Sequence, residues 1–148
     1  MPRVAKGNNG AVEFLNQIVE HELAGAVRYT QYSLMIFGHA RIPIISWMQG
    51  HAAEALAHAT QAGEEVTSHG GRVSLGIGKL VGTHHAHVDE ILGELVEHER
   101  GGIELYERLL EVVAGKDVAL EEYARGMIRA EEMHVAEILK MLKKRGDA

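Results

Sequence analysis

Apolar residues recur every three or four positions along four long stretches of the chain, the spacing that places them on one face of an α-helix. The pattern predicts helices over about residues 10–37, 44–68, 84–114 and 118–144. Asn9 can cap the first of these helices and Thr83 the third, because a side-chain oxygen at each position would accept a free backbone N–H. The predicted fold class is therefore all-α.

The lengths of the connections indicate how these helices are ordered. Short links at residues 38–43 and 115–117 join neighbours into antiparallel hairpins, whereas the glycine-rich stretch 71–83 is long enough to cross a bundle. We therefore predict one domain, a four-helix bundle with one long crossover between the second and third helices. The domain spans residues 1–148, with a first hairpin at 8–70, the crossover at 71–83 and a second hairpin at 84–144.

Composition narrows the class of protein. Hydrophobic residues make up 46% of the 148 residues, enough for a real core, and cysteine is absent, which excludes disulfides and thiolate metal sites. No apolar run approaches membrane length and no secretory leader precedes the first helix, so we expect a cytoplasmic protein without a membrane partner. The net charge of −6 argues against nucleic acid as the main partner.

The chain repeats a short motif. The residues Val-Glu-His-Glu stand at 19–22 and again at 96–99, an offset of 77 positions. The same offset leads from Glu54 to Glu131, and each of these glutamates is followed by a histidine one helical turn later. Each half of the chain therefore carries one glutamate on its first helix and a glutamate with a histidine on its second.

Three of these glutamates fall on the apolar stripes. Glu22, Glu99 and Glu131 stand among leucine, valine and isoleucine at the helical spacing, and no lysine or arginine shares their stripes. A charged carboxylate in a dry core costs several kcal/mol unless something compensates it. A pair of divalent cations would compensate all the carboxylates at once.

The neighbouring polar residues of the motif fall elsewhere on the helices. Glu20 and Glu97 lie two residues from the stripe glutamates, about 200° around the helix, and are expected to face solvent. His21 and His98 also fall off the stripe. These four residues are therefore not part of the predicted site.

Four carboxylates and two imidazoles, placed two-fold on four helices, form the ligand set of a dinuclear iron or manganese site. The terminal carboxylates, the bridging carboxylates and the imidazoles come in pairs, one from each hairpin: Glu22 with Glu99, Glu54 with Glu131, and His58 with His134. Two metal ions per subunit, iron or manganese or another divalent metal, are the expected cofactors, with open positions for O2 or peroxide.

The imidazole of the second helix has two candidates. His58 follows Glu54 by four residues, whereas His51 precedes it by three, and all three positions share one helical face. We predict His58 as the ligand, and His51 is the alternative ligand, or a residue that supports the ligands from behind or gates the site.

Two tyrosines accompany the predicted ligands. Tyr29 and Tyr106 lie seven residues after Glu22 and Glu99, on the same helical faces. They would hydrogen-bond ligand carboxylates or supply an electron, although core packing is the commoner role of such a residue.

These motifs resemble the ferritin-like superfamily, and within it the bacterioferritins. The resemblance covers about residues 12–143 and is strongest at residues 15–29, 58–59, 70–71 and 131–134. It implies ferroxidase activity, in which O2 or hydrogen peroxide oxidises Fe(II), with iron stored in a hollow homo-oligomer.

The chain departs from the bacterioferritin pattern at three points. The second-helix glutamate and histidine are four rather than three residues apart, and Ala55 stands where the family carries its haem-ligating methionine, so we expect no haem. The chain stops 14 residues after His134, before the short fifth helix of 24-subunit shells, which leaves a dimer, a 12-mer or a 24-mer open.

Two other classes of function fit the pattern less fully. One is a diiron or dimanganese enzyme without storage, either a rubrerythrin-like peroxidase or a hydroxylase. The absence of cysteine removes the rubredoxin-type electron donor that rubrerythrins usually carry. The other is a metal-free helical assembly protein, which would leave the core carboxylates unexplained.

Overall fold

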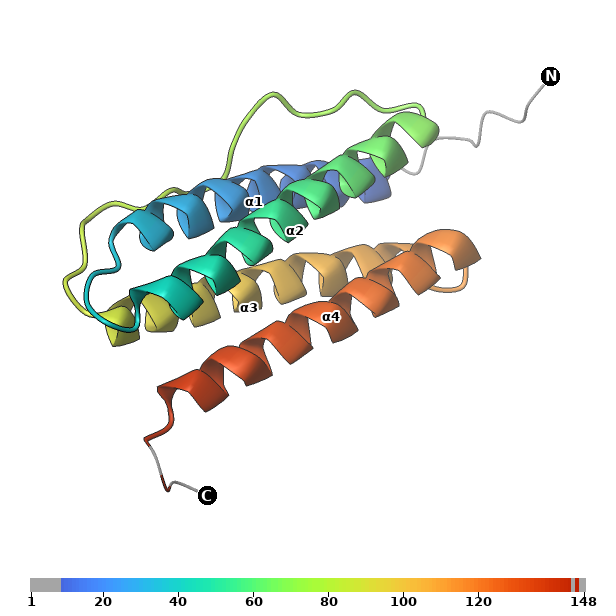
Figure 1. Cartoon of the computed structure of the whole chain (residues 1–148). Coiled ribbons are helices and arrows are strands. Elements are labelled where there is room, and N and C mark those ends of the chain that lie inside the picture. Colours follow the sequence, from blue (N-terminus) through green and yellow to red (C-terminus); the bar gives the residue numbers. More distant parts are fainter. Residues whose placement is uncertain (1–8, 145, 147–148) are drawn as a thin grey trace. The chain divides into compact units, whose positions relative to one another are not determined.

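A computed structural model describes residues 9–144 and residue 146, without the side chain of Asn9. Over these residues the structure consists of four α-helices and contains no strand, as the apolar pattern predicts (Figure 1). The helices are α1 at Asn9–Leu34, α2 at Arg41–Ser68, α3 at Val88–Val113 and α4 at Val118–Leu142. The predicted cap at Asn9 and the hairpin boundary at residue 8 lie outside what the structure describes.

The described residues form two compact units, one ending at His84 and the other beginning at His85. The first unit holds α1, α2 and most of the connection to α3, and the second unit holds α3 and α4. Each unit is an antiparallel helical hairpin, as the short predicted links require (Figure 1).

In the first unit, α1 and α2 pack through an apolar face. Large side chains such as Leu15 and Tyr32 are fully buried on α1, whereas α2 buries mainly alanines, which lets helices approach closely. Their link contains Gly38 at a φ of +95°, a left-handed conformation that glycine adopts without steric cost. The second helix begins at Arg41, three residues earlier than predicted, because Pro43 is tolerated in a first turn, where no N–H is needed.

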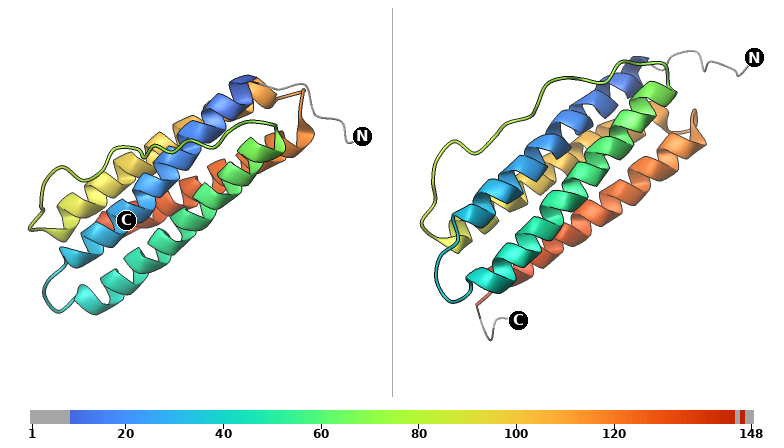
Figure 2. Two further views of the ribbon diagram at one scale, coloured as in Figure 1. Left: turned by 90° about the horizontal axis from the view of Figure 1, so that it is seen from above. Right: turned by 45° about the horizontal axis from the view of Figure 1, so that its top comes forward.

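The connection between α2 and α3 runs along α1 rather than away from it (Figure 2). Asn16 fixes its start, since its side chain donates to the carbonyl of Arg72 and accepts from the backbone N–H of Ser74. Further along, Gly78 donates its N–H to the carbonyl of Glu20 at 2.9 Å. A Cβ at Gly78 would come within 3.1 Å of that carbonyl oxygen, so glycine permits the close approach.

The start of α3 differs from the prediction. Thr83 does not cap it; the helix begins five residues later, at Val88, and the residue before it, His87, makes no side-chain cap hydrogen bond. Asp89 and Glu90 in the first turn favour this start, because carboxylates interact well with the positive end of the helix dipole. The crossover is accordingly longer than residues 71–83.

In the second unit a compact turn joins α3 to α4. Gly115 follows α3 at a φ of +73°, and the side chain of Asp117 caps α4 by accepting the N–H of Leu120 at 3.0 Å. The carboxylate of Glu121 accepts the N–H of Gly115 at 3.2 Å. Two carboxylates that accept backbone N–H groups therefore fix this turn.

Among the described residues, no helix combines the length and the apolar character needed to cross a bilayer.

Candidate metal centre

The first unit brings three predicted ligands together across α1 and α2. The imidazole of His58 lies between two carboxylates: its Nδ1 is 3.6 Å from Oε1 of Glu22, and its Nε2 is 3.7 Å from Oε1 of Glu54. The side chain of Glu22 is 7% exposed and that of His58 14%, whereas that of Glu54 is 42% exposed. The three residues thus extend from the buried interior towards solvent.

These separations suit a shared cation better than hydrogen bonds. An N–H···O hydrogen bond spans about 2.7–3.2 Å, which is shorter than either distance at His58. Two donors that each lie about 2.0–2.2 Å from one ion are separated by at most about 4.4 Å. Both His58–carboxylate pairs fall within that limit.

The second unit brings together the other three predicted ligands. Glu99 on α3 and Glu131 and His134 on α4 each offer a ligand atom, and these atoms lie within 4.8 Å of one another. Nδ1 of His134 is 3.3 Å from Oε2 of Glu131. A carboxylate beside an imidazole fixes the orientation of the ring, a common device at metal sites.

The burial of three carboxylates fits a cation-binding role. Glu22, Glu99 and Glu131 are only 6%, 7% and 2% exposed. No lysine or arginine is buried within the described part of the chain. Carboxylates in such surroundings either take up a proton or require nearby positive charge. Oxygen ligands with one or two imidazoles suit Fe(II) and Mn(II).

The polar neighbours of the motif are only partly as expected. Glu97 is well exposed, but Glu20 is half-buried because the crossover lies against its backbone. His98 lies off the glutamate stripe yet is only 8% exposed. The cause is a second buried stripe on α3, one residue away from the first: Ile91, Leu95, His98, Gly102 and Leu109. His98 is therefore a core histidine.

The second helices of the two units match at an offset of 76 residues rather than 77. The buried positions that α2 and α4 share at this offset are Met48 with Ala124, Ala55 with Glu131, Ala59 with Val135, and Ala62 with Ile138. His58 corresponds to His134 at the same offset. Ala55, 7% exposed, thus occupies the place of Glu131, and Glu54 lies one residue before it.

The two tyrosines are buried beside aromatic partners. Tyr29 is 1% exposed and packs edge-on against Trp47, with ring centroids 6.1 Å apart. Tyr106 is fully buried and meets Tyr123 edge-on at 6.0 Å. Trp47 and Tyr123 correspond at the 76-residue offset, a signal in the sequence that the motif search missed.

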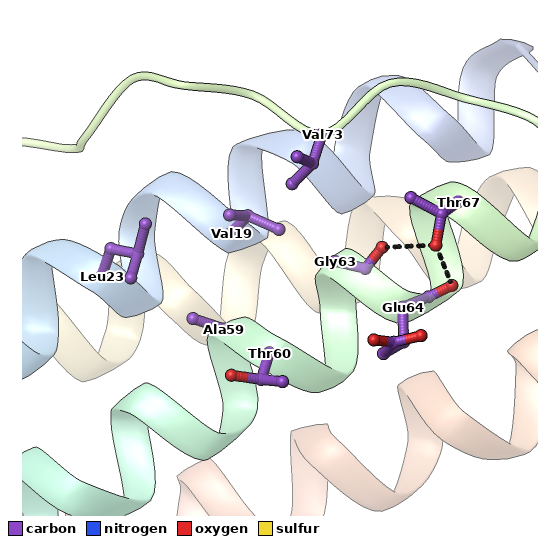
Figure 3. A pocket seen from close by; sticks show the side chains of 8 residues that line it. All are labelled: Val19, Leu23, Ala59, Thr60, Gly63, Glu64, Thr67 and Val73. Carbon is purple, nitrogen blue, oxygen red and sulfur yellow. Dashed lines mark hydrogen bonds between the residues drawn. The ribbon is translucent and has the colours of Figure 1, made fainter.

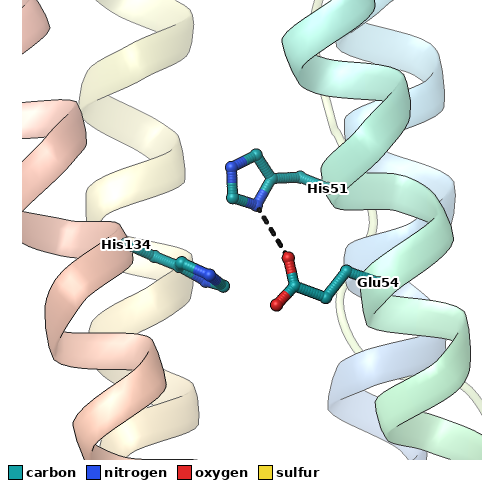
Figure 4. Close-up of side chains that lie close together, drawn as sticks. All are labelled: His51, Glu54 and His134. Atoms are coloured by element: carbon teal, nitrogen blue, oxygen red, sulfur yellow. Dashed lines mark ion pairs between the residues drawn. The ribbon is translucent and has the colours of Figure 1, made fainter.

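His51 also belongs to this region of the first unit. Its ring stacks on Tyr29 at 5.3 Å with an interplanar angle of 20°, and it contacts Trp47 edge-on at 4.5 Å. Its Nδ1 lies 3.7 Å from Oε2 of Glu54, and Figure 4 shows the two side chains extending towards each other from α2. Both candidate histidines of α2 therefore lie within ligand distance of Glu54.

A cavity of about 280 Å³ on the first unit is separate from these residues. Its lining comes from α1, α2 and the crossover: Val19, Leu23, Ala59, Thr60, Gly63, Glu64, Thr67 and Val73 (Figure 3). The hydroxyl of Thr67 donates to the carbonyls of Gly63 and Glu64 within its own helix. None of the lining residues is a predicted ligand, so the cavity is not the metal centre.

Comparison with known proteins identifies the fold. The sequence profile of the ferritin family, described as a ferritin-like domain, matches residues 12–145. No curated protein matches the chain by sequence. A ferritin-like diiron-carboxylate protein from Bacillus anthracis has a similar structure, with a TM-score of 0.86 and 20% identity over 94% of this chain and 99% of that one.

Two bacterioferritins have the same fold at similar identity. The protein from Rhodobacter capsulatus gives a TM-score of 0.82 at 19% identity, covering 93% of this chain and 86% of its own. The protein from Desulfovibrio desulfuricans, whose structure contains a diiron site, gives 0.83 at 21% identity, covering 91% and 79%. The predicted fold class, a ferritin-like four-helix bundle, is confirmed.

Proposed function

Because the chain belongs to the ferritin-like domain family, we propose that it is a ferroxidase that oxidises Fe(II) and stores or detoxifies the iron. One observation carries the proposal. Glu22, Glu99 and Glu131 are buried, whereas the described part of the chain buries no lysine or arginine. The imidazole of His58 lies 3.6 Å from Glu22, and that of His134 lies 3.3 Å from Glu131. This is the arrangement that a carboxylate-rich cation site requires.

The proposed ligand set combines both units into one dinuclear site. The first unit would contribute Glu22, Glu54 and His58, and the second Glu99, Glu131 and His134. The repeat supports this pairing, because each unit offers a glutamate from its first helix and an imidazole from its second. The family supports it as well, since ferritin-like proteins build such sites from inward-facing side chains of four helices.

The electron balance of the proposed reaction is simple. Two Fe(II) ions give up one electron each and become Fe(III). The two electrons, with two protons, reduce O2 to hydrogen peroxide or reduce hydrogen peroxide to two molecules of water. When bound, the pair of ions supplies this redox chemistry, and the protein provides ligands, orientation and a dry surrounding.

The side chains around the proposed ligands would orient them and keep the centre dry. The carboxylate of Glu131 orients the imidazole of His134 at 3.3 Å. Tyr29 and Tyr106 are both buried and would exclude water from the centre, and a hydrogen bond to a ligand or loss of an electron remains the prediction for them. Haem is not part of the proposal, because Ala55 offers no ligand, and we expect no Soret band after haem is added.

We also propose that the chain works as a homo-oligomer, a hollow cage in the cytoplasm, without nucleic acid as a partner. The related protein from Bacteroides fragilis is described as a dodecameric thioferritin, at 19% identity and a TM-score of 0.81. A closed assembly would separate oxidised iron from solution.

Anaerobic titration tests the proposal. We expect about two tightly bound Fe(II) per chain and rapid oxidation when O2 is admitted. Glu99→Ala should remove tight binding at one or both positions. Glu97→Ala is the matched control, because this residue lies two positions away on the same helix and its side chain is 74% exposed. Tight binding that survives Glu99→Ala together with Glu131→Ala would refute the proposal.

Measurement of native mass separates storage from the alternatives. A large hollow assembly that retains many iron atoms per chain supports storage. A dimer that binds two metals and retains no further iron would instead support a peroxidase or hydroxylase.

A further inference from the structure

The cavity of the first unit lies between α1, α2 and the crossover (Figure 3). None of the predicted metal ligands lines it, so the proposed reaction does not account for it. Its volume of about 280 Å³ is close to the lower limit of known ligand pockets, which is about 300 Å³. A ligand that fits this cavity is therefore a small molecule.

Small residues on α2 leave the space open. Ala59 and Gly63 stand one helical turn apart and both line the cavity. A Cβ at Gly63 would lie 3.6 Å from a methyl group of Val73 and 4.0 Å from one of Val19. Both are ordinary contact distances, so this position could hold a larger residue, and glycine leaves the volume unfilled.

The wall that the crossover contributes is held in place. The side chain of Asn16 on α1 donates to the carbonyl of Arg72 at 2.9 Å and accepts the N–H of Ser74 at 2.8 Å. These two residues flank Val73, whose side chain lines the cavity. The cavity is therefore preformed, and a ligand would not need to order the crossover when it binds.

The side chains of the lining offer no hydrogen-bond donor to a ligand. The hydroxyl of Thr60 donates to the carbonyl of Leu56 at 3.0 Å, and that of Thr67 donates to carbonyls of its own helix. Apart from Glu64, the other lining residues are apolar or glycine: Val19, Leu23, Ala59, Gly63 and Val73. An anion would thus find apolar surface and no side-chain partner here.

Glu64 is the one charged residue among those that line the cavity. Its side chain is exposed, so a cationic group beside it would keep most of its hydration while an attached alkyl chain is buried. An exposed ion pair adds little affinity, but it distinguishes a cation from a neutral molecule or an anion. The net charge of −6 favours a cation further.

We infer that this cavity binds a small aliphatic ammonium ion. The alkyl chain contacts Val19, Leu23 and Val73, and the ammonium group lies at the carboxylate of Glu64. The inference goes beyond the proposed function and does not depend on it, because no predicted metal ligand takes part.

Calorimetric titration of the full-length protein with n-butylamine, n-pentylamine and n-hexylamine tests the inference. We expect a single site per chain and an affinity that rises about fourfold with each added methylene, as burial of a CH₂ group predicts. 1-Hexanol should bind about twofold to fivefold more weakly than hexylamine, because it lacks the charge. Hexanoate should bind more weakly still, and equal affinity for hexanoate and hexylamine would overturn the inference.

Two variants locate the ligand. Gly63→Val fills the cavity and should lower the affinity for hexylamine by about tenfold or more, since the alkyl chain loses its buried surface. Gly50→Val is the matched control: it lies on the same helix at an exposed position where a Cβ meets nothing within 4 Å. Glu64→Gln should abolish the preference for hexylamine over hexanol. Unchanged hexylamine binding in Gly63→Val, or a preserved preference in Glu64→Gln, would refute the site.

A second copy of the chain is the alternative occupant of the cavity. If none of the three amines binds, the inference is wrong. Native mass then identifies the alternative, because Gly63→Val would change the oligomeric state and Gly50→Val would not. Circular dichroism confirms that each variant is folded.

Discussion

The two units carry the same kinds of predicted ligand but bury them differently. In the second unit the α4 carboxylate, Glu131, is 2% exposed and lies beside His134. In the first unit alanine stands at the equivalent position, and the carboxylate is one residue earlier, at Glu54, where the side chain is 42% exposed. Because a helix turns about 100° per residue, a shift of one position moves the group from the core to the rim.

This difference in burial predicts different affinities for the two carboxylates. A carboxylate at the core binds an ion strongly but is hard to reach, whereas one at the rim is reached easily and binds less strongly. Placing Glu54 at the rim also brings it within reach of His51. If both units bind ions as proposed, we expect the carboxylate of the first unit to be reached more easily and that of the second to bind more strongly.

The largest expected effect is on the rate of Fe(II) oxidation. Glu131→Ala removes a buried ligand and the partner of His134, and should lower the initial rate by about 100-fold or more. Glu54→Ala should lower the rate by about 10-fold, because this carboxylate is partly solvated. Stopped-flow absorbance after mixing with O2 measures both rates. Equal losses would show that the two glutamates are equivalent ligands.

A second contrast concerns the stability of the metal-free protein. Replacing a buried charged or protonated carboxyl by a similar apolar group removes its desolvation penalty. Glu131→Leu should therefore raise the free energy of unfolding by about 1–4 kcal/mol in the presence of a chelator. Glu54→Leu should change it by about 0.5 kcal/mol or less, since the site is exposed.

Urea denaturation measures both values, with Glu97→Leu as a surface control. A large gain from Glu54→Leu, or a loss of stability from Glu131→Leu, would contradict the assignment of core and rim.

The smallest effect is expected at the turns. The N–H of Gly115 and then the guanidinium of Arg125 lower the pKa of Glu121 in the second unit. A carboxyl whose pKa is lower in the folded state stabilises the fold above its unfolded pKa, and this contribution is lost as pH falls through the folded value. Glu121→Gln should therefore lower the melting temperature slightly at neutral pH, and the difference should vanish in acid.

The control for this prediction comes from the first unit. Its turn is fixed by Arg41, which donates to the carbonyl of Ile36 at 2.6 Å. Arginine does not titrate in this range. The effect of Arg41→Met on the melting temperature should thus be independent of pH between about 3 and 7. A similar pH dependence in both variants would show that the effect at Glu121 is not its own titration.

Much of the fold followed from the sequence because helical periodicity reports which residues are buried. The stripes through Glu22, Glu99 and Glu131 correctly predicted that all three are in the core. The end of α2 at Ser68 was also predicted, since glycine follows it. The start of α3 was not, because Thr83 has the chemistry of a cap but lies in a segment held against α1.

The finer arrangement of the site could not be predicted for a related reason. The periodic pattern does not say whether the two hairpins differ by one residue in their turns, so the offset of 77 between α1 and α3 predicts the same offset between α2 and α4. The burial of Ala55 shows that the offset there is 76. The stacking of His51 on Tyr29 joins different helices, which no local pattern reports.

The crossover that lies along α1 has a consequence for how the chain folds. Each hairpin makes its contacts between helices joined by a short turn, so closing either loop costs little entropy and both can form early. The long connection between α2 and α3 forms hydrogen bonds with α1 through Asn16 and Gly78. These bonds lie within the first unit. The crossover therefore adds its contacts to the first hairpin alone, and these contacts can form without the second hairpin.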